Sequence, residues 1–169
     1  STQAPLVFVG YGLTVPEMKY DDLEGLDLRG KVVVLLSGSP SDIPGPLRAH
    51  YQSVRWQFLK RAGVIGVIGI QNPLGQDIPW ERSKLSRLRP SLSLADSTLE
   101  ENQGLQLSVT FNNAKAEKLF VNSGHSFADI MKLALEGKAL RVVPTNEHAE
   151  AFCAPGGTRH IRSFCFSGG

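Results

Sequence analysis

Histidine, cysteine and acidic residues are the side chains that could hold a metal ion or activate a water molecule. The four histidines, at positions 50, 125, 148 and 160, are scattered, and no His-x-x-x-His or Cys-x-x-Cys spacing occurs. His148 with Glu150, and the pair Glu100 and Glu101, lie in polar stretches without a further ligand at zinc spacing. The acidic stretch 21–27 lacks the ligand spacing of a calcium loop. We therefore expect solvated surface at all of these positions and no metal site.

A nucleophilic serine would need a sharp turn and a histidine base nearby. The signature Gly-x-Ser-x-Gly is absent, and Ser123 and His125 are close only in sequence. Gly124 is suited to end one helix and Ser126 to cap the next, so this stretch is interpreted as a helix connection. Because no other set of titratable groups converges, we expect no catalytic residue in this chain and a non-catalytic module.

Charge and glycine patterns give no indication of a nucleotide or nucleic acid partner. Neither glycine-rich phosphate pattern lies between a strand and a helix. The basic cluster of Arg82, Lys84, Arg87 and Arg89 has no interleaved aromatic residues, so a solvated loop is favoured over a phosphate-binding groove. A formal net charge of +2 indicates no anionic partner. No apolar run approaches the roughly 20 residues of a membrane span, so none is expected.

The 169 residues fit one domain, with 41% hydrophobic and 20% charged residues, as is ordinary for a globular chain. The two cysteines, Cys153 and Cys165, lie near the carboxyl end. A disulfide between them would close only a tail loop, and two free thiols are the alternative. The cysteines therefore do not define the cellular compartment.

Two apolar runs, at residues 31–36 and 64–70, organise the chain. They are rich in β-branched residues and bounded by glycine, as is typical of strands that are covered on both faces. Over residues 49–62, apolar side chains recur at the spacing of one helix face, and Gly63 has the position of a C-terminal cap. We therefore predict a crossover unit with two paired central strands and layers on both sides of the sheet.

The rest of the chain adds several shorter elements. The patterns predict strands at 6–12, 105–111 and 140–143, the last closed by Pro144, and helices at 113–120 and 127–136. The prolines of residues 37–46 favour an extended, mobile loop, and residues 71–90 are too apolar to be a disordered spacer. The predicted fold class is α/β, at the borderline of α+β, with a domain at 1–144 and an unassigned tail at 145–169.

Seven stretches, in their order and spacing, carry a family resemblance. They are 6–12 (Leu-Val-Phe-Val-Gly-Tyr-Gly), 20–23 (Tyr-Asp-Asp-Leu), 26–35 (Leu-Asp-Leu-Arg-Gly-Lys-Val-Val-Val-Leu), 50–55 (His-Tyr-Gln-Ser-Val-Arg), 60–68 (Lys-Arg-Ala-Gly-Val-Ile-Gly-Val-Ile), 80–82 (Trp-Glu-Arg) and 114–120 (Ala-Lys-Ala-Glu-Lys-Leu-Phe). Together they resemble the protease-associated (PA) domain inserted in secreted di-zinc aminopeptidases, zinc peptidase family M, number twenty-eight. The resemblance covers about residues 5–143.

The resemblance implies a swivelling β/β/α fold, in which central β-sheets or a partly closed barrel pack with flanking helices. It further implies an accessory domain that acts as a lid or as a substrate-positioning surface and supplies no zinc ligand. Zinc would belong to the catalytic domain of a parent metallo-aminopeptidase, and this fragment itself would hold no cofactor. The implied partners are that catalytic domain and a peptide or protein substrate, and the implied location is secreted or periplasmic.

The candidate contact residues are His50, Tyr51, Trp80, Glu81 and Arg82, because aromatic side chains with polar tips beside loops are typical of contact surfaces. The alternative for Tyr51 and Trp80 is that they cover the edge of the core. The alternative function is a free-standing protein-interaction or sorting module of a receptor or a subtilisin-like protease.

Overall fold

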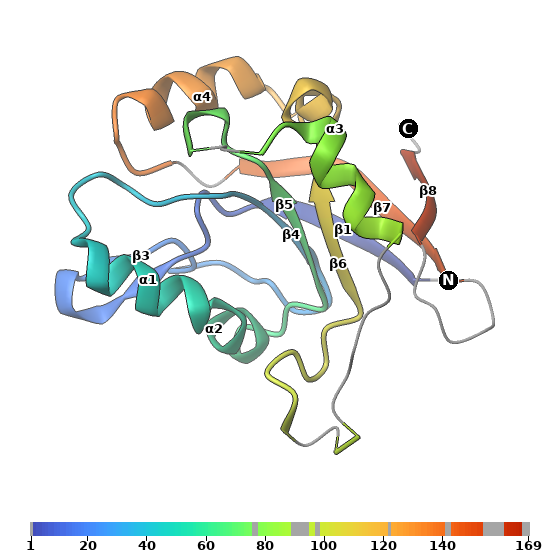
Figure 1. The fold of residues 1–169 in the computed structure, drawn as a ribbon, viewed down its shortest axis with the longest axis horizontal. Helices are drawn as coiled ribbons and strands as arrows, with labels where there is room; N and C mark the ends of the chain where they lie inside the picture. Colours follow the sequence, from blue (N-terminus) through green and yellow to red (C-terminus); the bar gives the residue numbers. More distant parts are fainter. Residues whose placement is uncertain are drawn as a thin grey trace.

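Six of the described strands form one open sheet, in the order β6-β5-β4-β1-β7-β8 (Figure 1). The structure is a computed structural model that describes residues 2–75, 78–88, 95–96, 99–121, 123–140, 143–153 and 161–166. The strands are β1 (Thr2–Phe8), β4 (Val32–Leu36), β5 (Gly66–Ile70), β6 (Leu107–Phe111), β7 (Val143–Cys153) and β8 (Ile161–Phe166). β1, β4, β5 and β6 are parallel, and β7 and β8 are antiparallel to their neighbours. The α/β class is confirmed, and these strands close no barrel.

The predicted central pair of strands is confirmed. Val32 of β4 is in parallel register with Gly66 of β5. All five residues of β4 are buried, as expected of a strand that is covered on both faces. Gly66 is required by close packing, because a Cβ built there would lie 2.8 Å from the Cβ of Leu107 on β6.

The crossover between β4 and β5 contains two helices, α1 (Gly45–Ser53) and α2 (Arg55–Arg61), rather than the single helix predicted over 49–62. Val54, with φ of −93° and ψ of 5°, separates them. This break follows from no sequence pattern that we can identify.

The structure contradicts the prediction at the start of the crossover and confirms it at the end. The extended loop predicted over 37–46 is wrong at its end, because Pro46 lies in the first turn of α1. A proline is accepted there since its missing N–H would have no partner within the helix. Gly63 follows α2 with a φ of 85°, which confirms the predicted C-terminal cap.

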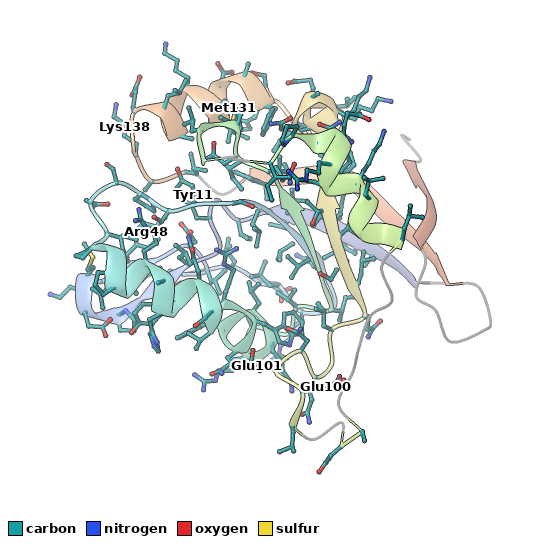
Figure 2. The ribbon with its side chains drawn as sticks, viewed as in Figure 1. Tyr11, Arg48, Glu100, Glu101, Met131 and Lys138 are labelled. Atoms are coloured by element: carbon teal, nitrogen blue, oxygen red, sulfur yellow. The ribbon has the colours of Figure 1, made fainter. Side chains whose placement is uncertain are left out.

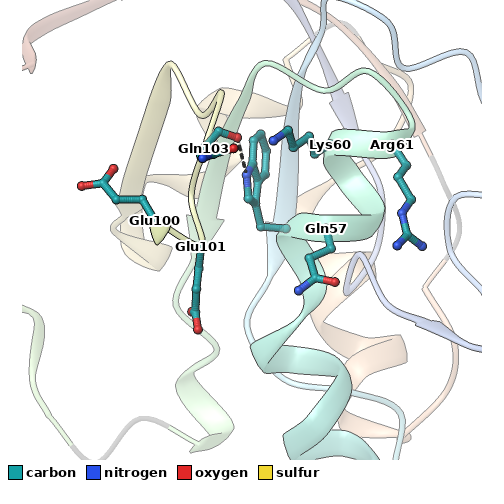
Figure 3. Close-up of a pocket in the computed structure, with 7 residues that line it drawn as sticks. Gln57, Lys60, Arg61, Glu100, Glu101 and Gln103 are labelled. Carbon is teal, nitrogen blue, oxygen red and sulfur yellow. Dashed lines mark hydrogen bonds between the residues drawn. The ribbon is translucent and has the colours of Figure 1, made fainter. Parts of the chain in front are cut away.

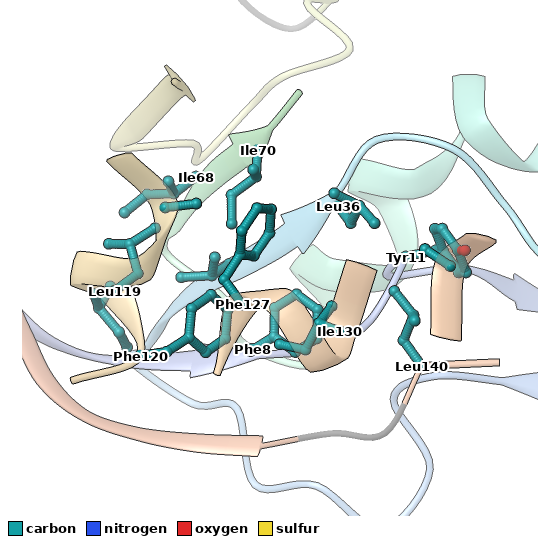
Figure 4. Packing of buried hydrophobic residues seen from close by; sticks show 14 of the residues in the cluster. Phe8, Tyr11, Leu36, Ile68, Ile70, Leu119, Phe120, Phe127, Ile130 and Leu140 are labelled. Atoms are coloured by element: carbon teal, nitrogen blue, oxygen red, sulfur yellow. The ribbon is translucent and has the colours of Figure 1, made fainter. Parts of the chain in front are cut away.

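Helices cover both faces of the sheet, as predicted (Figure 1). The 3-10 helix η5 (Asn113–Leu119) and α4 (Phe127–Leu135) lie on one face, where the rings of Phe8 and Phe120 meet with centroids 5.3 Å apart (Figure 4). Leu59 of α2 packs against β4 on the other face. The sheet is therefore the middle layer of three.

The helix predicted over 127–136 is confirmed, with its cap. The hydroxyl of Ser126 accepts a hydrogen bond from the backbone N–H of Asp129 at 3.1 Å. Gly137 follows the helix with a φ of 67°. The helix predicted over 113–120 is instead the 3-10 helix η5, which the side chain of Asn112 caps by accepting from the backbone N–H of Ala114.

The remaining elements lie in the two long connections. Between β1 and β4 are β2 (Thr14–Val15), the 3-10 turn η1 (Pro16–Met18) and β3 (Tyr20–Asp21), which form a small hairpin. Between β5 and β6 are η2 (Pro73–Gly75), α3 (Trp80–Ser83) and η3 (Lys84–Leu88). The strand predicted at 6–12 ends earlier, at Phe8, and the strand predicted at 105–111 begins later, at Leu107.

The prediction that Pro144 closes a short strand at 140–143 is wrong. β7 begins at Val143, runs through Pro144 and pairs with β1. Among the described residues, β8 pairs with β7 only from Ala149 onward. Pro144 therefore lies where they leave one edge of β7 unpaired, which is where a strand accepts proline. Strands thus lie within residues 145–169, and the division into a domain at 1–144 and a tail stays a prediction.

The register of β7 and β8 separates the two cysteines. Cys153 is opposite Ile161, and Cys165 is opposite Glu150. Four residues along a strand correspond to about 13 Å. The side chains of both cysteines lie outside the described residues, so a disulfide and two free thiols both stay predictions.

Candidate functional site

Two of the predicted contact residues, His50 and Tyr51, lie on α1 beside the hairpin. The His50 ring meets the Tyr51 ring edge-on, with centroids 4.9 Å apart. The Tyr51 hydroxyl donates to the Glu17 carboxylate, 2.7 Å from Oε2. This hydrogen bond raises the pKa of Tyr51 and lowers the pKa of Glu17. His50 is exposed, whereas Tyr51 is part of the buried core.

The other three predicted residues form most of α3. Glu81 and Arg82 are exposed, and Trp80 is half-buried. The Glu81 carboxylate forms an ion pair with the ammonium of Lys84, one turn further along. α3 is tied to the end of β5, because the Gln71 side-chain amide donates to the Ser83 hydroxyl at 3.2 Å. The structure therefore holds α3 in place and leaves its charged side chains to solvent.

The structure does not bring these two groups together. α1 belongs to the β4–β5 crossover, whereas α3 belongs to the connection between β5 and β6. Figure 1 shows the two helices well apart in the view. The five predicted residues therefore define two separate surfaces rather than one.

Exposed apolar side chains accompany α3. Leu74, Ile78, Leu85 and Leu88 have exposed fractions between 49% and 72%. Single exposed apolar residues are ordinary, but a concentration along one segment indicates an interaction surface. The segment 74–88, including Trp80, is therefore the strongest candidate contact surface among the described residues.

A buried polar cluster lies at the end of β1. Among the described residues Asp22 is the one charged residue in the buried class. Its carboxylate accepts from the backbone N–H of Leu13 at 3.0 Å and from the Tyr20 hydroxyl at 2.5 Å. Burial raises the pKa of Asp22 to about 6, although both hydrogen bonds act in the opposite direction. Asp22 thus holds the hairpin against the loop that follows β1.

Arg55, the first residue of α2, supplies positive charge to this cluster. Burial lowers the pKa of Arg55, and Asp22 acts against that shift. The Arg55 Nε is buried without a hydrogen-bond partner in the described part of the chain. A carboxyl with a pKa near 6 has the acidity of a general acid–base catalyst. Because Asp22 is closed off from solvent, we assign it to holding the fold.

The interpretation of residues 21–27 as a solvated loop is therefore wrong at Asp22. The available signal was the i, i+2 spacing of Tyr20 and Asp22, which places two side chains on one side of an extended segment. A sequence does not show which backbone N–H such a carboxylate will meet, since Leu13 lies on the other arm of the hairpin.

The described residues do not fit a zinc ion. Among them, no group of three or more histidine, cysteine, aspartate or glutamate side chains converges on a point where a metal could lie. Within the same segments, every helix falls short of the length and apolarity that a membrane crossing requires.

A groove of about 460 Å³ lies between α2 and the loop that precedes β6 (Figure 3). Its lining residues are Trp56, Gln57, Lys60, Arg61, Glu100, Glu101 and Gln103. The indole N–H of Trp56 donates to the backbone carbonyl of Gln103 at 3.1 Å and so joins the two walls. The interpretation of Glu100 and Glu101 as solvated surface missed this groove, because its walls lie about 40 residues apart in sequence.

No family model matches the chain, and no curated protein matches it. Among solved structures, the chain is similar to "Aminopeptidase from Aneurinibacillus sp. strain AM-1", with 14% sequence identity and a TM-score of 0.36. The match covers 92% of this chain and 30% of that enzyme, so the chain spans less than a third of the enzyme's length. A likeness of this extent carries no argument about function, which must come from the residues described above.

Proposed function

We propose that this chain is a PA-type accessory domain of a zinc aminopeptidase, in which it covers the active site or positions peptide substrate. In this proposal it has the swivelling β/β/α fold, the parent protein is secreted or periplasmic, and zinc lies in the separate catalytic domain. Its partners are that domain and a peptide or protein substrate.

Two of the stretches that carry the resemblance meet in space, which supports the proposal. The Gly-Tyr-Gly turn after β1 and the Tyr-Asp-Asp sequence of the hairpin come together at Asp22. Gly10 is needed there, because its φ is 64° and a Cβ built on it would lie 3.3 Å from Asp22 Oδ1. The resemblance therefore rests partly on residues that must occur together to build this corner.

The observation that carries the proposal is the exposed apolar surface of residues 74–88, with Trp80, Glu81 and Arg82 in its middle. Apolar side chains that remain in solvent on a folded domain favour contact with another protein or a peptide. The half-buried Trp80 beside exposed charges has the composition of an interface anchor with a polar rim.

The test measures binding of a fluorescein-labelled pentapeptide that has a free amino terminus and an apolar first residue. We expect Trp80→Ala to weaken binding at least about fivefold, as for an anchor worth about 1 kcal/mol, without a change in the far-ultraviolet spectrum. Lys138→Gln, on the loop after α4, is the matched control and should bind normally. Equal affinity of the Trp80→Ala variant, or its unfolding, would favour a core-edge role for Trp80.

A second measurement tests whether the chain alone has peptidase activity. The purified chain is assayed with aminoacyl chromogenic substrates and added zinc, and no turnover is expected. Turnover that survives repurification and follows metal content would contradict the proposal. The coding sequence on either side of the chain distinguishes the accessory domain from the alternative, a free-standing interaction module. A membrane span would favour a receptor module, and a downstream His-x-Asp would favour a peptidase.

A further inference from the structure

We propose that the groove between α2 and residues 100–103 binds an extended peptide segment that carries one basic and one acidic side chain on the same face. This site is separate from the segment 74–88. It lies beside the loop that leads into β6, whereas α3 follows the end of β5. Neither proposal depends on the other.

The groove is preformed because backbone hydrogen bonds fix its loop wall. Gln106 N–H donates to the Ile65 carbonyl at 2.8 Å, and Leu105 N–H donates to the Asn102 carbonyl at 3.1 Å. The bond from the Trp56 indole to Gln103 then ties this loop to α2. A ligand would therefore meet an ordered site and need not organise it.

The two walls carry opposite charges. α2 contributes Lys60 and Arg61, and the loop contributes Glu100 and Glu101. In the described part of the chain, none of these four side chains takes part in an ion pair. Both cations are held apart from the carboxylates by local packing.

The packing of each cation is visible in the structure. The Lys60 stem lies over the loop, where a Cβ on Gly104 would be 3.7 Å from Lys60 Cε. The Arg61 guanidinium lies over the Phe58 ring, 5.6 Å from its centroid. The groove thus offers a positive wall and a negative wall that do not neutralise each other directly.

An extended peptide matches this arrangement. Side chains two residues apart lie on one face of an extended chain, about 6.6 Å apart along it. A basic side chain would approach the acidic loop wall at one of its two carboxylates, and an acidic side chain would approach the basic wall of α2. The Trp56 indole lines the groove and offers apolar surface to the peptide, and the Gln57 amide can bond to the peptide backbone.

Two other ligand classes fit the groove less well. A phosphate-bearing ligand such as a nucleic acid would meet two carboxylates on the loop wall. A metal ion would need convergent oxygens, but Figure 3 shows the carboxylates of Glu100 and Glu101 pointing in different directions. The charge pattern therefore favours a ligand that carries both signs.

The experiment titrates the folded chain with acetyl-Ala-Lys-Ala-Glu-Ala-amide and follows the indole N–H signal of Trp56 by NMR. Acetyl-Ala-Lys-Glu-Ala-Ala-amide, with its charges on opposite faces, is the matched peptide control. We expect the first peptide to shift the Trp56 signal saturably and to bind at least about threefold more tightly than the second. Assignment uses Trp80→Phe, which leaves one indole signal.

Charge variants locate the peptide in the groove. Glu100→Gln with Glu101→Gln should weaken binding about fivefold, and Lys60→Gln with Arg61→Gln should do the same. The glutamate double variant should bind a peptide without lysine as tightly as wild type does. The Lys60 and Arg61 double variant should bind a peptide without glutamate as tightly as wild type does. Lys138→Gln is the control, because Figure 2 shows Lys138 far from Glu100 and Glu101.

The result that overturns the inference is equally specific. No saturable shift of the Trp56 signal, equal affinity for the two peptides, or affinities unchanged in both charge variants would each exclude it. The substituted side chains lie at the surface, so an unchanged amide spectrum of each variant establishes that the fold is kept. Failure of the Trp80→Ala test leaves this inference unaffected, since that test concerns α3.

Discussion

Two carboxylates of the same small hairpin each accept a hydrogen bond from a tyrosine, and their different burial shifts their pKa values in opposite directions. At the tip, Tyr51 donates to Glu17, and the hydrogen bond lowers the pKa of this exposed carboxyl. At the base, Tyr20 donates to Asp22, yet burial raises the pKa of Asp22 to about 6. The hydrogen bond favours the charged carboxylate in both pairs, and desolvation outweighs it only at the base.

The comparison separates two ways of fixing one hairpin. Asp22 also accepts from the backbone N–H of Leu13, so its loss would leave buried donors without a partner. Glu17 is exposed, and water can replace it as the acceptor for Tyr51. The hydrogen bond between Tyr20 and Asp22 should therefore matter for the stability of the fold. The hydrogen bond between Tyr51 and Glu17 should mainly change the pKa of Glu17.

The largest effect is expected for Asp22→Ala. At pH 5, where the native carboxyl is largely neutral, the change removes the acceptor of Leu13 N–H and of the Tyr20 hydroxyl and costs about 4 kcal/mol. Urea denaturation at pH 5 measures this cost. Glu17→Ala is the matched control and should have a much smaller effect. Similar losses for both variants would contradict the distinction between the two ends of the hairpin.

The next effect is the dependence of stability on pH. The native pKa of Asp22 is about 6, raised from an ordinary value of 3.8. The stability that this group contributes is therefore fully present below pH 3.8 and lost as the pH rises through 6. A shift of about 2 pKa units corresponds to about 3 kcal/mol.

Asp22→Asn tests this dependence, because it keeps an acceptor for Leu13 N–H and removes the titration. We expect wild type to lose about 2 kcal/mol relative to Asp22→Asn between pH 4 and pH 7 in urea denaturation, because part of the effect is already lost at pH 4. A constant difference across that range would show that Asp22 titrates normally.

The central strands were predictable from sequence because the signal is local. The continuous apolar run of β4 matches its burial on both faces, and Ser126 with Asp129 marks the start of α4 within four residues. These features depend on neighbours in the chain, so periodicity and capping rules detect them.

The polar cluster and the groove were not predictable, because each depends on contacts between distant residues. The role of Asp22 depends on where Leu13 lies, and the groove depends on Trp56 meeting Gln103. The predicted contact residues were separated for the same reason. His50 belongs to the connection between β4 and β5, and Trp80 belongs to the connection between β5 and β6. The sequence pattern within one connection does not indicate how far its residues lie from those of the other.

A smaller effect is expected for Tyr20→Phe. It removes one donor to Asp22 and keeps the ring, so the cost should be about 1 kcal/mol. The pKa of Asp22 should rise further, because the Tyr20 hydrogen bond acts to lower it. Carbon-detected NMR titration of the Asp22 carboxyl measures the shift. A pKa that falls in this variant would mean that Tyr20 does not donate to the carboxylate.

The smallest effect on stability is expected for Tyr51→Phe, which should raise the pKa of Glu17 toward its ordinary value. In wild type, the depressed pKa of Glu17 gives stability that is present above the ordinary pKa and lost as the pH falls through the native value. The charge of His50 also lowers the pKa of Glu17, so His50→Gln serves as the comparison. NMR titration of the Glu17 carboxyl should show the larger upward shift in Tyr51→Phe. A larger shift in His50→Gln would show that the charge of His50, and not the Tyr51 hydrogen bond, mainly lowers the pKa of Glu17. The two carboxyls would then differ in the charges near them as well as in burial.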